Sequence, residues 1–173
     1  MISLNEILKH KKPLFFTPKW LKIATHITPV QAINWLLETR LNDLYKQQII
    51  AGELDFLAQK SVCIDVTNLP LSVFISLDKT QNRLNVIVIK PTVFSRNITR
   101  YDGRLSGCSD TFLTLMAGQS DPDTLFFSRK LSIFGDTELC LMVKNWLDTQ
   151  DPEAALPNPL YHALQSYVQT LEN

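Results

Sequence analysis

The sequence predicts an α+β fold, in which a mostly antiparallel sheet carries helices over one of its faces. Two observations lead to this class. Apolar residues recur every three to four positions along the segments 29–51 and 136–148, which is typical of helices that bury one side. From Ser61 to Ile89 apolar and polar residues alternate instead, which is typical of half-buried strands that short turns connect.

Size and composition limit the classes of protein that fit. The 173 residues suffice for one domain with a terminal extension. Seventeen basic and seventeen acidic residues cancel, so no overall field would attract nucleic acid. Three widely spaced cysteines argue against a disulfide framework and favour a reducing compartment. Because no apolar run approaches the roughly 20 residues that span a bilayer, and the first residues lack a secretory signal, we expect a cytoplasmic protein.

Residues 1–28 are predicted to form an amphipathic extension that faces a membrane or a partner. Thr17 and Pro18 provide a cap and a first helical residue. The helix that follows would dock on the domain or lie in a membrane interface, with its lysines near anionic headgroups. We favour reversible association with the inner membrane, because two phenylalanines extend the apolar patch. The membrane-facing residues would be Phe15, Phe16, Lys19, Trp20, Lys22, Ile23 and Ile27.

The same apolar face would need cover away from a membrane. Exposed apolar patches of this kind commonly mark interaction sites. We therefore expect a homodimer that hides the face when no membrane is near.

Residues 29–173 are predicted to form the domain itself, including a carboxy-terminal helix. Its longest helix should run over 29–51, and Gly52 can end that helix in the left-handed conformation. A short helix over 110–117 should end at Gly118. Strands are expected at 61–67, 71–77, 84–89 and 104–108, whereas 90–102 is either an edge strand or a loop packed on the domain.

The segment 121–148 organises the rest of the chain. Asp121 and Pro122 begin a helical turn that carries an apolar cluster, and a strand over 129–134 ends at Gly135. Asp136 is a natural cap for the next helix, whose apolar stripe ends at Trp146. A proline-containing linker over 149–159 then leads to a last helix over 160–171.

These elements supply large, flexible apolar side chains with no catalytic group between them. Such stripes are usually core, but in a lipid carrier one face can be both core and pocket wall. Methionine suits a pocket because its thioether adapts to an irregular chain. The candidate lipid-binding residues are Leu37, Leu41, Leu44, Phe112, Met116, Phe126, Phe127, Leu139, Met142, Val143 and Trp146.

Motifs for catalysis or cofactor binding are not found. The sequence has no glycine-flanked serine elbow, no phosphate-binding or dinucleotide-binding glycine pattern, and no zinc spacing. Its histidines, His10, His26 and His162, lie far apart. We therefore expect no metal, no cofactor and no enzymatic activity. A small lipid-modifying enzyme is the weakest hypothesis, and an interaction module with a filled core is the main alternative to a lipid carrier.

Three stretches carry a resemblance to a known family: DPDTLFF at 121–127, GDTEL at 135–139, and VKN at 143–145 followed by Leu147 and Asp148. A weaker match lies at 52–57. Over about 28–148 the chain resembles the sterol carrier protein type-two (lipid-binding) family, and within it the accessory factors of oxygen-independent ubiquinone biosynthesis. The resemblance implies a sheet of about five strands and a polyprenylated quinone precursor or a phospholipid as ligand. It also implies action together with the iron–sulfur hydroxylases UbiU and UbiV.

Overall fold

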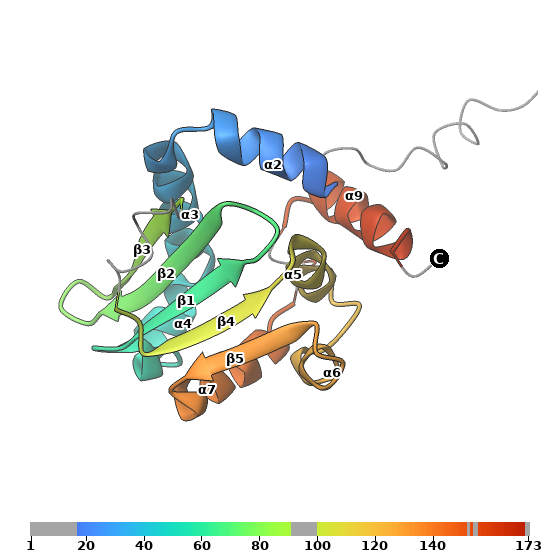
Figure 1. Cartoon of the computed structure of the whole chain (residues 1–173). Coiled ribbons are helices and arrows are strands. Elements are labelled where there is room, and N and C mark those ends of the chain that lie inside the picture. Colours follow the sequence, from blue (N-terminus) through green and yellow to red (C-terminus); the bar gives the residue numbers. More distant parts are fainter. Residues whose placement is uncertain (1–16, 91–99, 152, 154–155, 172–173) are drawn as a thin grey trace, which may run out of the picture.

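A computed structural model describes residues 17–90, 100–151, 153 and 156–171 of the chain. It has the expected α+β architecture, with one five-stranded sheet (Figure 1). Across the sheet the strands lie in the order β3-β2-β1-β4-β5. Their bounds are β1 Ser61–Val66, β2 Leu71–Asp78, β3 Arg83–Ile89, β4 Gly103–Gly107 and β5 Leu131–Gly135.

The sheet is mixed rather than purely antiparallel. β1, β2 and β3 pair antiparallel in sequence, as the short turns predict. β4 does not continue beside β3 but lies parallel to β1, and β5 then pairs antiparallel with β4. The expectation of a mostly antiparallel sheet is therefore confirmed, while pairing strictly in chain order is wrong for β4.

β4 does not pair with the outer edge of β3, because α3 already occupies that edge. Asn42 donates to the carbonyl of Leu84 at 2.9 Å and accepts from its N–H at 2.7 Å. Asn34, two turns earlier, accepts from the N–H of Val88 at 2.8 Å. These amide side chains take the place of a neighbouring strand, so the free edge of β3 is closed.

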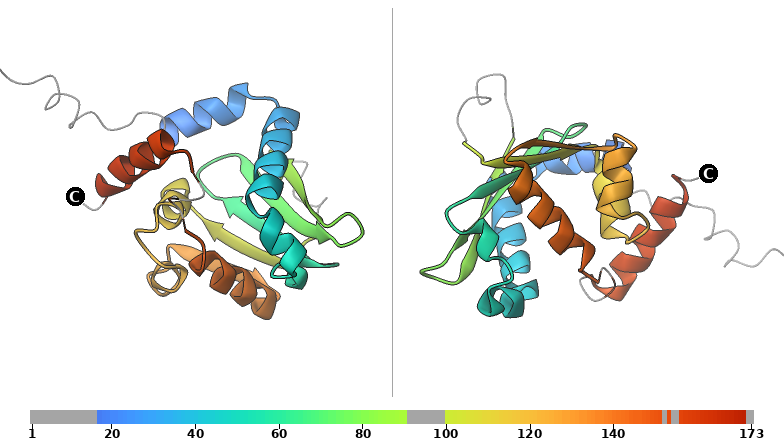
Figure 2. Two further views of the ribbon diagram at one scale, coloured as in Figure 1. Left: turned by 180° about the vertical axis from the view of Figure 1, so that it is seen from behind. Right: turned by 90° about the horizontal axis from the view of Figure 1, so that it is seen from below.

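The helices are grouped in two places. On one face of the sheet lie α3 (Val30–Leu44), α4 (Lys46–Ala51) and α7 (Thr137–Asp148), which Figure 2 shows from behind. A second group packs around buried residues of α5 and α9. Short helices complete the chain. The remaining helical bounds are η2 Asp55–Leu57, α2 Pro18–Ile27, α5 Ser109–Met116, α6 Pro122–Phe127 and α9 Asn158–Gln169.

The helix expected over 29–51 is divided. Tyr45 leaves the helical conformation with φ −102° and ψ 16°, and α4 begins after it. The break turns Ile49 into the core, where it is buried. Gly52 ends α4 with φ 80°, as predicted.

The strand expected over 129–134 begins two residues later. Arg129 has φ 60° and donates to the carbonyl of Phe126, while Lys130 donates to the carbonyl of Leu125. This pair of bonds is the Schellman motif that closes a helix at its carboxyl end. Arg129 and Lys130 therefore finish α6, and β5 starts at Leu131.

Candidate functional site

The floor of the candidate site is the sheet face that α3 and α7 cover. It is unevenly filled. Val62, Leu77 and Leu105 are almost fully buried in the main core cluster. Other apolar side chains on this face are only half-buried, although Val73 between them is buried. These half-buried side chains are Ile64, Val66, Leu71 and Ile75.

One wall is α3, whose apolar stripe lies over β2 and β3. Ile33 and Leu37 pack on Val73, Val86 and Val88. Leu41 also belongs to this cluster, and it reaches the main core cluster as well. No residue of α3 is fully buried, so this helix covers the sheet along one side only.

The opposite wall is α7. Asp136 caps this helix by accepting from the N–H of Leu139 at 3.0 Å, as the sequence predicts. Leu139 and Val143 are buried against the sheet. Trp146, one turn further on, is half-buried. Its ring meets that of Tyr45 edge to face at a centroid distance of 4.7 Å, which joins the two walls.

Trp146 also carries an unsatisfied polar atom. Its indole Nε1 is buried, and among the described residues it has no hydrogen-bond partner. A buried donor without a partner costs about 1–3 kcal/mol. Burial also raises the pKa of the neighbouring Tyr45 hydroxyl, which therefore stays neutral. Trp146 and Tyr45 thus place two uncharged polar groups at the junction of the two walls.

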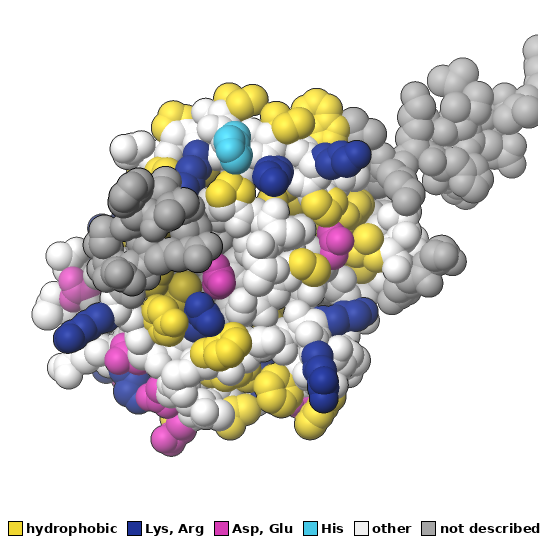
Figure 3. All heavy atoms as spheres, in the orientation of Figure 1, with side chains coloured by type: hydrophobic (Ala, Val, Ile, Leu, Met, Phe, Trp, Pro, Cys, Tyr) yellow, Lys and Arg dark blue, Asp and Glu magenta, His cyan; other side chains and the backbone are white. Residues whose placement is uncertain are grey.

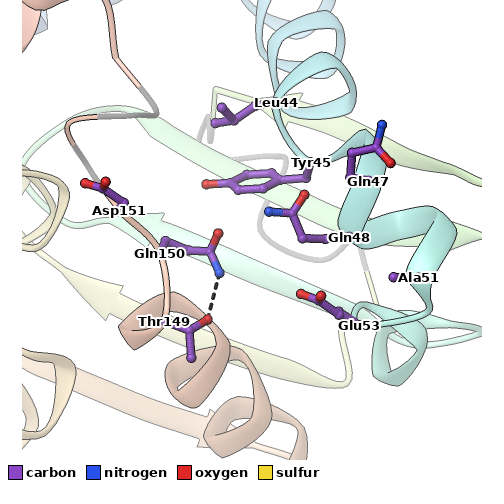
Figure 4. A pocket seen from close by; sticks show the side chains of 9 residues that line it. All are labelled: Leu44, Tyr45, Gln47, Gln48, Ala51, Glu53, Thr149, Gln150 and Asp151. Carbon is purple, nitrogen blue, oxygen red and sulfur yellow. Dashed lines mark hydrogen bonds between the residues drawn. The ribbon is translucent and has the colours of Figure 1, made fainter.

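An open hollow of about 830 Å³ lies at this junction (Figure 4). Tyr45 and Gln48 approach it from the α3–α4 corner, and Gln150 faces them from the segment after α7. Gln150 donates to the carbonyl of Trp146 at 2.9 Å, which ties the rim to the aromatic pair. The full lining is Leu44, Tyr45, Gln47, Gln48, Ala51, Glu53, Thr149, Gln150 and Asp151.

The candidate lining residues fall into three groups. Six pack in the core clusters, fully or half buried: Leu37, Leu41, Phe112, Leu139, Val143 and Trp146. Leu44 lines the hollow. The other four are exposed at the surface: Met116, Phe126, Phe127 and Met142. α3 and α7 thus cover the same face of the sheet, but the structure does not gather all eleven side chains around one space.

Phe126 and Phe127 line a different hollow. Its volume is about 470 Å³, and it lies along β5. Phe127 is 79% exposed there, against 41% for Phe126.

Several residues of the site were not singled out from the sequence. Tyr45 was part of the long helical stripe, but the break beside it carries no proline or glycine that would have revealed it. Gln48 and Gln150 interrupt or follow apolar stripes and resemble ordinary surface residues. Ile64 and Ile75 were assigned to strands, and only the helix placement shows them half-buried.

The amino-terminal helix α2 exposes the face that the sequence marks as apolar. Trp20, Ile23 and Ile27 are exposed, Ile27 at 77%. Leu21, from a neighbouring face, packs against the cluster of α5 and α9. Lys19 and Lys22 are also exposed, whereas Phe15 and Phe16 lie outside the described residues. Apolar side chains and cations lie side by side over α2 in Figure 3.

The described part of the chain lacks two other features. It contains no cluster of histidine, cysteine and acidic side chains that could hold a metal ion. None of its helices is both long and apolar enough to cross a membrane.

Comparison with known proteins identifies the fold. Residues 39–148, which include the last turns of α3, the whole sheet and α7, match the SCP-2 sterol transfer family. The chain belongs to this family. Across 136 residues it is 35% identical to the ubiquinone biosynthesis accessory factor UbiT of Escherichia coli strain K12, which covers 79% of this chain and 72% of UbiT. The UbiT proteins of E. coli O6:H1 and O157:H7 match equally well.

A solved structure supports the SCP-2 fold. It is described as the UbiJ-SCP2 ubiquinone synthesis protein, and it aligns with a TM-score of 0.53. The alignment covers 70% of this chain and 93% of that chain at 15% identity, so the likeness concerns the fold alone.

Proposed function

We propose that this SCP-2 domain is a non-catalytic lipid-binding accessory protein of ubiquinone biosynthesis. Its ligand is a polyprenylated quinone precursor or a phospholipid, held between α3, α7 and the sheet. One observation carries the proposal: half-buried apolar side chains run from Leu37 and Leu41 across Ile75 to Trp146, and an open hollow begins beside them at Tyr45. The 35% identity to UbiT supports the pathway.

The energetics explain why such a protein is needed. Each buried methylene of an isoprenoid tail is worth about 0.8 kcal/mol relative to water. A soluble enzyme could extract such a substrate from a membrane only if something else sheltered the tail. A carrier with an apolar lining that matches the bilayer interior brings the transfer close to balance.

In this proposal Trp146 recognises the polar end of the ligand. The indole N–H of Trp146 is buried and lacks a partner among the described residues. A quinone, phenol or ester oxygen placed beside it would accept that hydrogen bond and remove the cost of the unsatisfied donor. Trp146 thereby selects an oxygen-bearing head group, while α3 and α7 accept the tail.

The chemistry itself would belong to partner proteins. Tyr45, Glu53 and Asp151 are the ionisable residues at the hollow, and no nucleophile with a base lies among them. In this proposal the chain presents its ligand to the hydroxylases UbiU and UbiV, and the pathway operates without oxygen.

The surface of α2 would bring the carrier to its source of lipid. Lys19 and Lys22 lie beside the exposed side chains of Trp20, Ile23 and Ile27. Lysines near anionic headgroups add roughly 1 kcal/mol each, which is enough for reversible docking. The protein would thus be cytoplasmic and visit the inner membrane, and a homodimer would cover the same face in solution.

An arginine at the mouth of the hollow tests the ligand site. Leu44→Arg is expected to weaken binding of a fluorescent-tailed phospholipid about tenfold, because it places a charge on the entry path. The matched control is Leu160→Arg on α9, a leucine of similar exposure that lies outside the hollow. Fluorescence titration of both variants provides the measurement. Equal affinities for the two would remove the hollow from the proposal.

A second variant tests membrane docking separately. Ile23→Asp is expected to reduce sedimentation with phosphatidylglycerol-containing vesicles at least fivefold, since it charges the apolar face of α2. Ile87→Asp on the sheet is the control, because Ile87 is also about half exposed. If Ile87→Asp reduced sedimentation equally, or Ile23→Asp did not, α2 would not be the docking element.

A further inference from the structure

The two edge strands of the sheet, β3 and β5, differ in whether their outward backbone groups are hydrogen-bonded. At β3 the outward backbone groups of Leu84 and Val88 are bonded by asparagines of α3. At β5, the opposite edge, no helix of the described chain does the same, because α6 reaches only the start of the strand (Figure 1). An open edge is a template for another strand unless it is blocked.

The register shows which backbone groups of β5 are free. Asp136 donates its N–H to the carbonyl of Asp102 at 2.7 Å, so this is a hydrogen-bonded pair of the antiparallel ladder. In an antiparallel ladder, hydrogen-bonded pairs alternate with pairs that are not bonded. The next bonded pair is therefore Arg104–Phe134, and the pair after it, Leu105–Ile133, is not bonded. The N–H and C=O of Ile133 therefore point away from β4, and they have no hydrogen-bond partner among the described residues.

Apolar side chains flank this free edge. The hollow of about 470 Å³ along β5 is lined by Phe126 and Phe127 of α6 and by Ile133 and Phe134 of the strand. Phe127 and Phe134 remain largely uncovered. A segment that paired with β5 would bury these rings, with its side chains alternating between the two sides of the edge.

The side chains around the β5 edge include positive charges that no carboxylate of the described chain pairs with. Arg129 lines the hollow and makes no ion pair within the described chain. Arg104 stacks its guanidinium on Phe134 at 4.4 Å, and its buried Nε has no partner in the described residues. The nearby acids are already occupied, since Asp136 pairs with Lys60 at 2.8 Å and Asp123 pairs with Lys144.

From these observations we infer that β5 is a docking edge for an extended segment of a partner protein, which adds a sixth strand antiparallel or parallel to β5. The segment carries apolar side chains for the hollow of Phe126 and Phe127 and at least one carboxylate for Arg129. A second copy of this chain fits less well, because it would bring the same unpaired cations to the edge. The inference does not depend on the lipid, and it stands or falls separately from the proposed function.

The test uses the full-length chain and a synthetic eight-residue peptide that alternates valine with glutamate. We expect binding, with slowed exchange of the Ile133 amide hydrogen measured by NMR. A peptide that is N-methylated at every residue should not bind, because neither of its edges can donate hydrogen bonds to the ladder. A peptide with lysine in place of glutamate should bind at least tenfold more weakly.

Matched variants separate the backbone from the side chains. Ile133→Pro removes the outward N–H, which an edge strand tolerates, whereas Ile133→Ala keeps it and shortens the side chain. We expect Ile133→Pro to weaken the peptide about tenfold more than Ile133→Ala does. Arg129→Glu should weaken it at least fivefold, and Arg40→Glu on α3 should leave it unchanged.

Several outcomes would overturn the inference. Equal binding of the N-methylated peptide would show that no strand is added, and this result is decisive even if the proline variant fails to fold. Concentration-dependent dimerisation that Arg129→Glu abolishes would assign the edge to a second copy. Protection of the Ile133 amide by anionic vesicles, but not by the peptide, would assign it to a membrane.

Discussion

Replacement of Gly135 by alanine is expected to destabilise the fold by about 2–5 kcal/mol. Gly135 ends β5 with φ +82°, where an L side chain is strained. A Cβ atom there would also lie 2.3 Å from the carbonyl oxygen of Asp102. That oxygen cannot easily move, because it accepts from the N–H of Asp136, and the Asp102 carboxylate accepts from the N–H of Ser61 at 2.7 Å.

Gly52→Ala is the matched control for this prediction. Gly52 has nearly the same φ of +80°, but its added Cβ would meet only the Asp55 side chain at 3.4 Å. It should therefore cost about 1–2 kcal/mol, the conformational part alone. Urea unfolding of the two variants measures the difference. If both lost the same stability, the close approach of β5 to Asp102 would not be as tight as described.

Substitution of Trp146 distinguishes a lipid carrier from an interaction module with a filled core. In a filled core Trp146→Ala should cost about 3–5 kcal/mol. The half-buried indole and its orphan N–H instead predict a smaller loss of stability in delipidated protein, together with loss of most bound lipid. A full loss of stability with unchanged lipid content would favour the filled core.

Trp146→Phe sharpens this comparison, because it keeps an aromatic ring against Tyr45 while it removes the donor and shortens the side chain by one ring. Losing an unsatisfied buried N–H gains about 1 kcal/mol, which offsets part of the cost of the smaller ring, so Trp146→Phe should lose clearly less stability than Trp146→Ala. Retention of a ligand with an oxygen-bearing head should fall. Chemical denaturation and lipid extraction of the same preparation would provide both values.

Much of the fold could be predicted from local sequence. The caps at Asp121 and Asp136 form the bonds expected of them, to Thr124 and Leu139. Such signals act within a few residues, so a linear reading finds them. The alternation in β3 likewise reflects burial on one face, whereas β1 and β2 also have buried residues on the other face.

Long-range placement could not be predicted in the same way. β4 lies beside β1 because α3 closes the edge of β3 through Asn34 and Asn42, two residues that resemble surface polar positions. Lys144 also resembled an exposed helical residue, yet it is buried and paired with Asp123. Periodicity shows that a side chain is apolar, but the packing of distant elements decides which apolar side chains meet.

In the candidate site, too, local sequence predicts some features and misses those that depend on long-range packing. The stripes that end at Leu41 on α3 and at Trp146 on α7 do face a shared sheet. Met142 belongs to the stripe of α7 and Met116 to a similar stripe on α5, but both lie on the outside. Around α7, Met142 lies about 60° from Leu139 and about 100° from Val143, a difference that a broad apolar stripe does not resolve.

In the proposed function the domain holds an apolar lipid between α3, α7 and the sheet. Native mass spectrometry of the full-length protein, purified without detergent, tests it most directly. We predict a co-purifying species with the mass of a polyprenylated phenol or a phospholipid, present in the wild type and largely lost in Trp146→Ala. A spectrum that contains only the bare polypeptide in both proteins would contradict the account.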